Sequence, residues 1–161
     1  MTKTAFKVLY DKYFDLLRNY VYYRCGNQEM ATDIAQETFL KIWQKQLFPD
    51  PGKEKALLFK MATDMYISQF RRQKLDQKYV KQVKSGDNTA PSPHDEMQFT
   101  ETQNKYNKVI SDLSENLRTT YLMNRIDGLT YAEIATNLGL SVKAIEKRMS
   151  TILNVLRKEL L

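Results

Sequence analysis

The stretch LTYAEIATNLGLSVKAIEKRMSTILNVLRKEL at residues 129–160 decides the fold of the C-terminal part of this chain. Thr130 and Glu133 have the spacing of a capping box, which predicts that a helix begins between them. Gly139 can adopt the left-handed conformation that ends this helix, and Ser141 can cap the next one. The stretch therefore predicts a helix-turn-helix, a unit whose second helix usually enters the major groove of DNA.

The second helix of this unit separates an apolar stripe from a basic face. Apolar residues recur three and four positions apart, as one buried face of a helix requires: Val142, Ile145, Met149, Ile152 and Leu156. Lys143, Lys147 and Arg148 lie off the stripe in the first two turns, where a recognition helix meets bases and phosphates. The alternative is an ordinary helical hairpin whose charged face is only solvated.

Composition and charge restrict the remaining possibilities. The chain has 161 residues, 42% of them hydrophobic, and its net charge of +6 favours a polyanionic partner. The single cysteine, Cys25, excludes an internal disulfide and is typical of a reducing cytoplasm. The charged N-terminus does not resemble a signal peptide, and no stretch approaches the ~18 uninterrupted apolar residues of a membrane span. We therefore expect a cytoplasmic protein with no direct membrane insertion.

Proline, glycine and periodicity divide the chain into two helical blocks. Residues 81–102 contain one glycine and two prolines, show little periodicity and predict a flexible linker. Apolar residues recur at three and four in the flanking blocks, 1–80 and 103–161, without convincing strict alternation. The expected fold is therefore all-α, with two small helical domains joined by a flexible linker. Before the helix-turn-helix pair, helices are expected over residues 3–24, 28–46, 54–77, 104–112 and 114–126.

The second expected helix carries two acidic residues one turn apart. Asp33 and Glu37 share a face, with Gln36 beside them. One interpretation is a solvated acidic face that a Glu37–Lys41 ion pair supports by a few tenths of a kcal/mol. The other is a docking face for a basic partner protein. Spacing alone favours the solvated face, because charged faces are mostly only solvated.

The third expected helix combines aromatic residues with a basic end. Phe59, Tyr66 and Phe70 recur about once per turn, and Arg71 and Arg72 follow. Rings that stack on bases, together with cations that hold phosphates, are typical of single-stranded DNA binding. Alternatively the rings belong to the core, which we expect of Phe59 and Phe70, and the cations favour the helix C-terminus. The preceding loop, QLFPDPGKEK, is restricted by its prolines and could hold a base that has left the stack.

Three motifs in this order resemble bacterial RNA polymerase sigma factors of the sigma-70 family, in the minimal extracytoplasmic-function (ECF) form. DIAQETFLKIW at 33–43 is similar to the region that grips the clamp helices of the polymerase β′ subunit. LLFKMATDMYISQFRR at 57–72 is similar to the family's −10 recognition helix, and the loop at 46–53 lies where the family captures a flipped −10 base. Residues 113–150 resemble the domain that reads the −35 element.

The resemblance implies a protein that binds core polymerase, directs it to specific promoters and assists DNA opening, by binding rather than catalysis. It implies polymerase contacts from Asp33, Gln36 and Glu37, a contact with the β flap, and an anti-sigma factor that occludes both domains. The −10 contacts that it implies are Phe48, Lys53, Lys60, Tyr66, Arg71 and Arg72. The −35 contacts are Ser141, Lys143, Lys147 and Arg148.

The chain departs from the family pattern at several positions. The family often has Trp where this chain has Leu57, and Pro where it has Ser114. It often has Asn where this chain has Asp64, and Asp where it has Ser68. An anion in place of an amide donor disfavours a nearby phosphate, so the resemblance leaves open which −10 bases are read.

Two other classes of function have less support. An enzyme would lack its usual residues, because the only histidine, His94, lies in the expected linker and no Gly-rich phosphate loop occurs. One His and one Cys cannot build a usual zinc site, and nothing adds ligands to Asp33 and Glu37, so neither metal nor cofactor is expected. A stand-alone helix-turn-helix regulator with an N-terminal dimerisation domain would bind a palindromic duplex tightly without polymerase.

Overall fold

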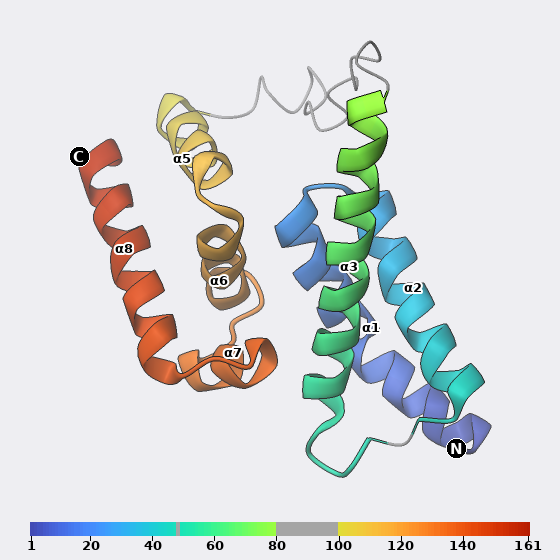
Figure 1. Cartoon of the computed structure of the whole chain (residues 1–161). Coiled ribbons are helices and arrows are strands. Elements are labelled where there is room, and N and C mark those ends of the chain that lie inside the picture. The colour runs from blue at the N-terminus through green and yellow to red at the C-terminus, as the bar shows by residue number, and fades with distance from the viewer. Residues whose placement is uncertain (48, 80–99) are drawn as a thin grey trace. The chain divides into compact units, whose positions relative to one another are not determined.

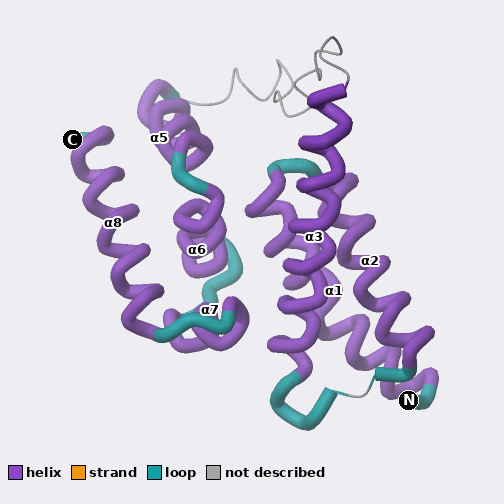
Figure 2. The backbone as a smooth tube through the Cα atoms, viewed as in Figure 1, coloured by secondary structure: helices purple, strands orange, loops and turns teal. Residues whose placement is uncertain are grey.

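The protein forms two separate helical units. The computed structural model describes residues 1–47, 49–79 and 100–161, and of residues 73–79 it describes only the backbone. Every regular element in these ranges is a helix (Figures 1 and 2). The chain divides into the units Met1–Gly86 and Asp87–Leu161, which confirms an all-α fold with two helical domains. Most of the expected linker, including His94, lies outside the described residues.

The described residues of the N-terminal unit form a bundle of three helices, and local signals mark where the first two begin. The Thr2 hydroxyl oxygen caps the first helix by accepting the Ala5 N–H at 3.0 Å, and Gly26 ends it at a φ of 70°. The Asn27 side chain caps the second helix. All three helices agree with the expected ranges to within two residues. They are α1 (Lys3–Cys25), α2 (Gln28–Lys45) and α3 (Glu54–Tyr79).

Each of these helices buries one face against the other two. The largest fully buried side chains of this unit come from all three helices: Leu17, Ile34, Phe39, Ile42, Leu58 and Phe59. Phe39 packs against two aromatic rings of α1: its ring centroid lies 5.0 Å from that of Tyr10 and 6.1 Å from that of Phe14. Because this packing occupies the inner side of α2 and α3, their outer sides are left to polar residues.

In residues 100–161, the described part of the C-terminal unit, there are four helices, and α8 packs against each of the other three. The first helix begins at Glu101 rather than at 104, because Thr100 and Gln103 form a complete capping box. The last three residues of the expected linker therefore belong to this helix or to its cap. The four helices are α5 (Glu101–Asp112), α6 (Glu115–Arg125), α7 (Tyr131–Leu138) and α8 (Val142–Leu160).

The apolar stripe of α8 forms the centre of this unit, but it is shorter than expected. Ile145, Met149 and Ile152 are buried as the spacing predicts. Val142 is 42% exposed and Leu156 is half-buried, so the expectation of burial was wrong for both ends of the stripe. The buried part of the stripe is therefore limited to the middle turns of α8.

Candidate nucleic-acid interface

The turn between α7 and α8 has the caps that the sequence predicts. The Thr130 hydroxyl oxygen accepts the Glu133 N–H at 3.1 Å, and the Ser141 hydroxyl oxygen accepts the Ala144 N–H at 3.1 Å. Gly139 ends α7 with a φ of 66°, in the left-handed region that favours glycine. These caps fix the directions in which α7 ends and α8 begins, and so set which side of α8 faces solvent.

The basic residues at the start of α8 do not share one environment. Ser141, Lys143 and Lys147 are exposed, whereas Arg148 is half-buried. The Arg148 guanidinium donates a hydrogen bond from Nη1 to the hydroxyl oxygen of Thr120 in α6, at 3.2 Å. Arg148 therefore ties α8 to α6, a structural role that spacing alone did not indicate.

The outer side of α2 carries the three residues of the expected docking face. Asp33, Gln36 and Glu37 are all exposed, while Ile34 on the other side of the helix is fully buried. Within the described part of the chain no ion pair joins Glu37 to Lys41, so the pair that the solvated-face interpretation uses is not formed. The exposed carboxylates make this an acidic surface that complements a basic partner.

An apolar residue adjoins these acidic side chains. Leu40 follows Gln36 by one turn and Glu37 by three residues, so it lies on the same side of α2. Its side chain is 51% exposed. The sequence reasoning missed Leu40 as a surface residue, because its position in an apolar-rich motif is also that of a core residue.

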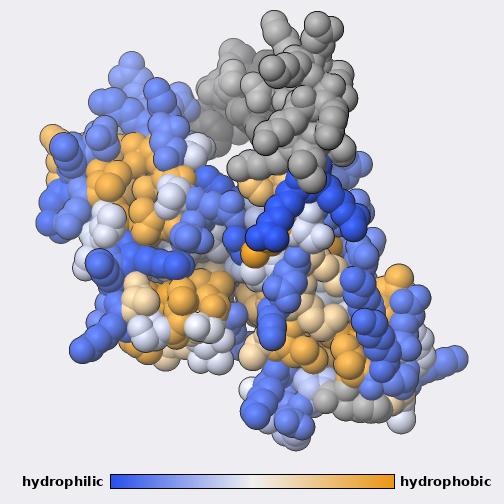
Figure 3. Space-filling model, in the orientation of Figure 1, coloured by the Kyte–Doolittle hydropathy of each residue, from blue (hydrophilic) through white to orange (hydrophobic). Residues whose placement is uncertain are grey.

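Outward-facing cations lie along α3 and in the loop before it. Lys60, Arg71 and Arg72 are exposed, and so is Lys53, whose ammonium group is 4.0 Å from the Asp50 carboxylate. The strongly hydrophilic side chains on this face of the N-terminal unit gather over the C-terminal half of α3 (Figure 3). Phe48, the other candidate in this loop, lies outside the described residues.

For two of the three aromatic residues of α3 considered above, the observed exposure differs from what the sequence predicts. Phe59 is 1% exposed, which confirms that it belongs to the core. Tyr66 is only 4% exposed, because the Arg24 guanidinium of α1 lies 4.8 Å from its ring centroid. A base cannot reach this ring in the described arrangement, which argues against the expected Tyr66 contact. Phe70 is 39% exposed, so the expectation that it is buried was wrong.

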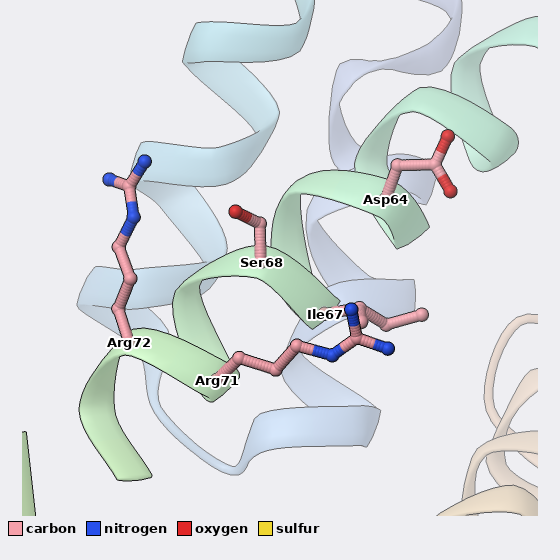
Figure 4. Close-up of a pocket in the computed structure, with 5 residues that line it drawn as sticks. All are labelled: Asp64, Ile67, Ser68, Arg71 and Arg72. Carbon is pink, nitrogen blue, oxygen red and sulfur yellow. The ribbon is translucent and has the colours of Figure 1, made fainter. Parts of the chain in front are cut away.

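A shallow hollow follows the exposed side of α3. Its lining residues are spaced at three, four, seven and eight positions, so all lie on one face of the helix: Asp64, Ile67, Ser68, Arg71 and Arg72. Asp64 lies at one end of the hollow and the two arginines lie at the other, with Ser68 and Ile67 between them (Figure 4). The hollow thus combines an anion, a hydroxyl, an apolar side chain and two cations within about two helical turns.

A pair of tyrosines joins α5 to α6 in the C-terminal unit. The hydroxyl groups of Tyr106 and Tyr121 are 2.7 Å apart, and Tyr121 is buried. Burial, followed by the hydrogen bond with Tyr106, raises the pKa of Tyr121 from 10.0 to about 12. Tyr121 is therefore neutral at physiological pH, and its hydrogen bond with Tyr106 links α5 to α6.

Comparisons with known proteins agree with this arrangement. Residues 9–75 match the family model described as Sigma-70 region 2, and residues 103–153 match the one described as Sigma-70, region 4. The chain belongs to the sigma-70 family. Both matches fall within the helical units described above, one in each, and the residues between them are left unmatched. As an ECF sigma factor, the protein binds RNA polymerase and directs promoter-specific transcription initiation.

Curated relatives extend the likeness over most of the chain. The ferric citrate uptake sigma factor FecI of Escherichia coli (strain K12) is 28% identical, over 89% of this chain and 83% of its own length. The ECF RNA polymerase sigma factor SigW of Bacillus subtilis (strain 168) is 27% identical, over 97% of this chain and 89% of its own length. Both matches therefore span most of each relative rather than a single motif.

A solved structure shows the same fold. The sigma factor RpoE of Bartonella quintana, crystallised with the anti-sigma factor NepR, is similar with a TM-score of 0.65. The two chains are 20% identical, and the match covers 97% of this chain and 96% of RpoE. None of the helices in the described ranges of our protein is long and apolar enough to cross a membrane.

Proposed function

We propose that this sigma factor acts by binding alone, in the cytoplasm, through three surfaces with separate tasks. The outer side of α2 docks on the β′ clamp helices of core polymerase. The outer side of α3 and the loop before it hold the −10 element. The start of α8 holds the −35 element, and the C-terminal unit also contacts the β flap. No step of this mechanism needs a metal, a cofactor or a chemical reaction of the protein itself.

One observation carries this assignment, namely that exposed charges of opposite sign lie on different helices. Asp33 and Glu37 on α2 repel DNA phosphates and attract a basic protein surface. Lys143 and Lys147 on α8 attract DNA phosphates and repel a basic protein surface, and the cations at the end of α3 do the same. The exposed Leu40 beside these carboxylates adds apolar surface, which favours a protein partner over DNA.

DNA opening follows from binding rather than from work done by the protein. A base that leaves the stack costs a few kcal/mol, which contacts to the unpaired strand must offset. Arg71 and Arg72 supply phosphate contacts, and the half-exposed ring of Phe70 supplies a surface on which a base can stack. Phe70 replaces Tyr66 in this role, because Tyr66 is covered by Arg24.

The net charge of +6 supports only modest affinity of the free protein for DNA. Polymerase would therefore be needed to present both domains at the spacing of the promoter elements. This dependence separates the proposal from a stand-alone regulator, which would bind its duplex tightly alone.

Transcription reconstituted from purified components tests the proposal. The protein is added to core polymerase and a mixed promoter library, and specific start sites are mapped. We expect start sites that depend on the protein and share sequence at −35 and −10. Tight duplex binding by the protein alone, with no specific starts, would instead support the regulator.

We also propose that an anti-sigma factor controls the protein by covering its interaction surfaces. The structural relative RpoE was crystallised with such a factor, NepR. Our protein exposes docking and DNA-binding surfaces that would otherwise engage polymerase and promoters whenever it is present. Co-purification from the native host, followed by identification of bound proteins, tests this part. Recovery of the protein with polymerase subunits alone, under conditions in which its promoters are silent, would contradict it.

A further inference from the structure

We propose that Asp64 selects cytosine at one position of the −10 element that is still base-paired when it is read, by accepting a hydrogen bond from the cytosine N4 amino group. This inference rests on the proposed function, because it assumes that α3 faces the −10 element. It goes further by assigning a base to one side chain.

Asp64 is a negatively charged residue that lies in a row between positively charged residues along the exposed side of α3. Lys60 lies one turn before it on the same side of α3, and Arg71 and Arg72 lie about two turns after it. All four side chains are exposed. No ion pair between Asp64 and these cations occurs among the described residues, so the carboxylate is available to a partner.

This row restricts how a DNA strand can lie along α3. Lys60 and the two arginines attract phosphates, whereas Asp64 repels them. A strand held at both ends of the row must therefore present something other than phosphate to the carboxylate between them. Figure 4 shows Asp64 turned to the outside of the helix, beyond Ser68 and Ile67, where a base edge can approach it. The group that fits is a hydrogen-bond donor on a base.

The chemistry of a carboxylate then selects among the bases. An ionised carboxylate only accepts hydrogen bonds. In a base pair the Watson–Crick edges are occupied, so the protein meets the major-groove edge. On that edge cytosine offers the N4 amino donor, whereas adenine places the N7 acceptor beside its amino group, and thymine and guanine offer acceptors only. A carboxylate is therefore suited to cytosine. An asparagine at the same position has a donor and an acceptor, and so matches adenine.

Asp64→Asn tests this assignment, because it changes hydrogen-bonding capacity and leaves size almost unchanged. Each protein directs core polymerase on a library with a randomised −10 element, and base frequencies are counted at the transcribed promoters. We expect cytosine to be favoured at one position by the unchanged protein. With Asp64→Asn the ratio of cytosine to adenine at that position should fall at least about fivefold, the lower end of what one specific base contact provides.

A matched control separates specificity from the loss of a negative charge. Asp15→Asn removes a carboxylate from α1 in the same unit, where the side chain is 82% exposed, and should leave all base frequencies unchanged. Base frequencies that are equal for the unchanged protein and Asp64→Asn would overturn the assignment, as would loss of all transcription by a folded Asp64→Asn. Failure of the proposed function would look different, because the unchanged protein itself would then give no specific starts.

Discussion

A buried amide in α7 gives a quantitative test of the packing of the C-terminal unit. Asn137 is 5% exposed, and neither its Oδ1 nor its Nδ2 atom has a hydrogen-bond partner. A buried polar group without a partner costs about 1–3 kcal/mol. Asn137→Leu keeps nearly the same shape and removes this cost. Leucine also favours the helical state over asparagine by about 0.5 kcal/mol. We therefore expect the free energy of unfolding to rise by about 2 kcal/mol.

This change should be visible in thermal unfolding. In a domain of this size, 1 kcal/mol moves the melting temperature by about 4–8 °C, so the C-terminal unit should melt about 8–16 °C higher. Far-UV circular dichroism follows the helices of both units. The fluorescence of Trp43, the only tryptophan, follows the N-terminal unit and should be unaffected.

Asn154→Leu is the matched control for this experiment. Asn154 is exposed on α8, so the same substitution there changes stability only within about 0.5 kcal/mol. If Asn137→Leu lowered the melting temperature of the C-terminal unit, or changed it no more than Asn154→Leu does, the amide would have to be hydrogen-bonded in solution. The reasoning from an unsatisfied buried group would then be refuted.

Four further variants test the surfaces and the tyrosine pair. Asp33→Lys combined with Glu37→Lys should abolish co-purification with core polymerase at unchanged helix content, because a basic partner would meet cations; normal co-purification would refute the docking face. Lys147→Glu should weaken binding of the polymerase complex to a −35 duplex and reduce the slope of log affinity against log salt concentration by about 1 or more. Arg148→Glu should in addition destabilise the C-terminal unit, since its guanidinium holds a threonine of α6; equal unfolding free energies for the two variants would contradict this role. Because folding raises the pKa of Tyr121 from 10.0 to about 12, the folded unit holds the phenolic proton more tightly than the unfolded chain does. The stability that this protonated hydroxyl group contributes is complete below pH 10 and is lost as the pH rises to about 12. The loss amounts to at most about 2.7 kcal/mol. Tyr121→Phe should lack this part of the alkaline loss when unfolding is compared at pH 9 and 11.5, and parallel losses in both proteins would argue against it.

Features that depend on neighbouring residues could be predicted from the sequence. The caps at Thr130, Gly139 and Ser141 use atoms within three residues of each helix end, so a local pattern is sufficient to find them. The same holds for the ends of α1 and α2. The acidic face of α2 was located for a similar reason, since residues three and four apart share a helix face in any environment.

Features that depend on another helix could not be predicted in this way. Tyr66 and Phe70 are four residues apart on α3, and their spacing does not distinguish them. Tyr66 is buried because Arg24 of α1 covers it, and Phe70 extends beyond that cover. Arg148 likewise differs from Lys147 only because a hydroxyl group of α6 lies within its reach.

The hollow of α3 could be predicted from the sequence only in part. The sequence singled out Asp64 and Ser68 as departures from the family pattern, but not as members of one surface. Their spacing to Arg71 and Arg72 contained that information, since all four positions fall within one helical face. The signal was missed because aromatic residues, rather than polar ones, were used to choose the functional side of this helix.

The two sides of α3 are subject to different constraints on change. On the inner side, at most 1% of each residue is exposed at Leu58, Phe59 and Ala62, which pack in the core and hold the helix in place. On the outer side, Asp64 and Ser68 are exposed and do not contribute to this core. Substitutions at exposed positions of this kind typically alter stability by no more than about 0.5 kcal/mol. Under the −10 role that we propose for this side, gene duplicates of such a factor can acquire new promoters through a few surface changes that leave stability almost unchanged. The same separation would make the outer side of α3 a suitable place to engineer orthogonal promoter recognition.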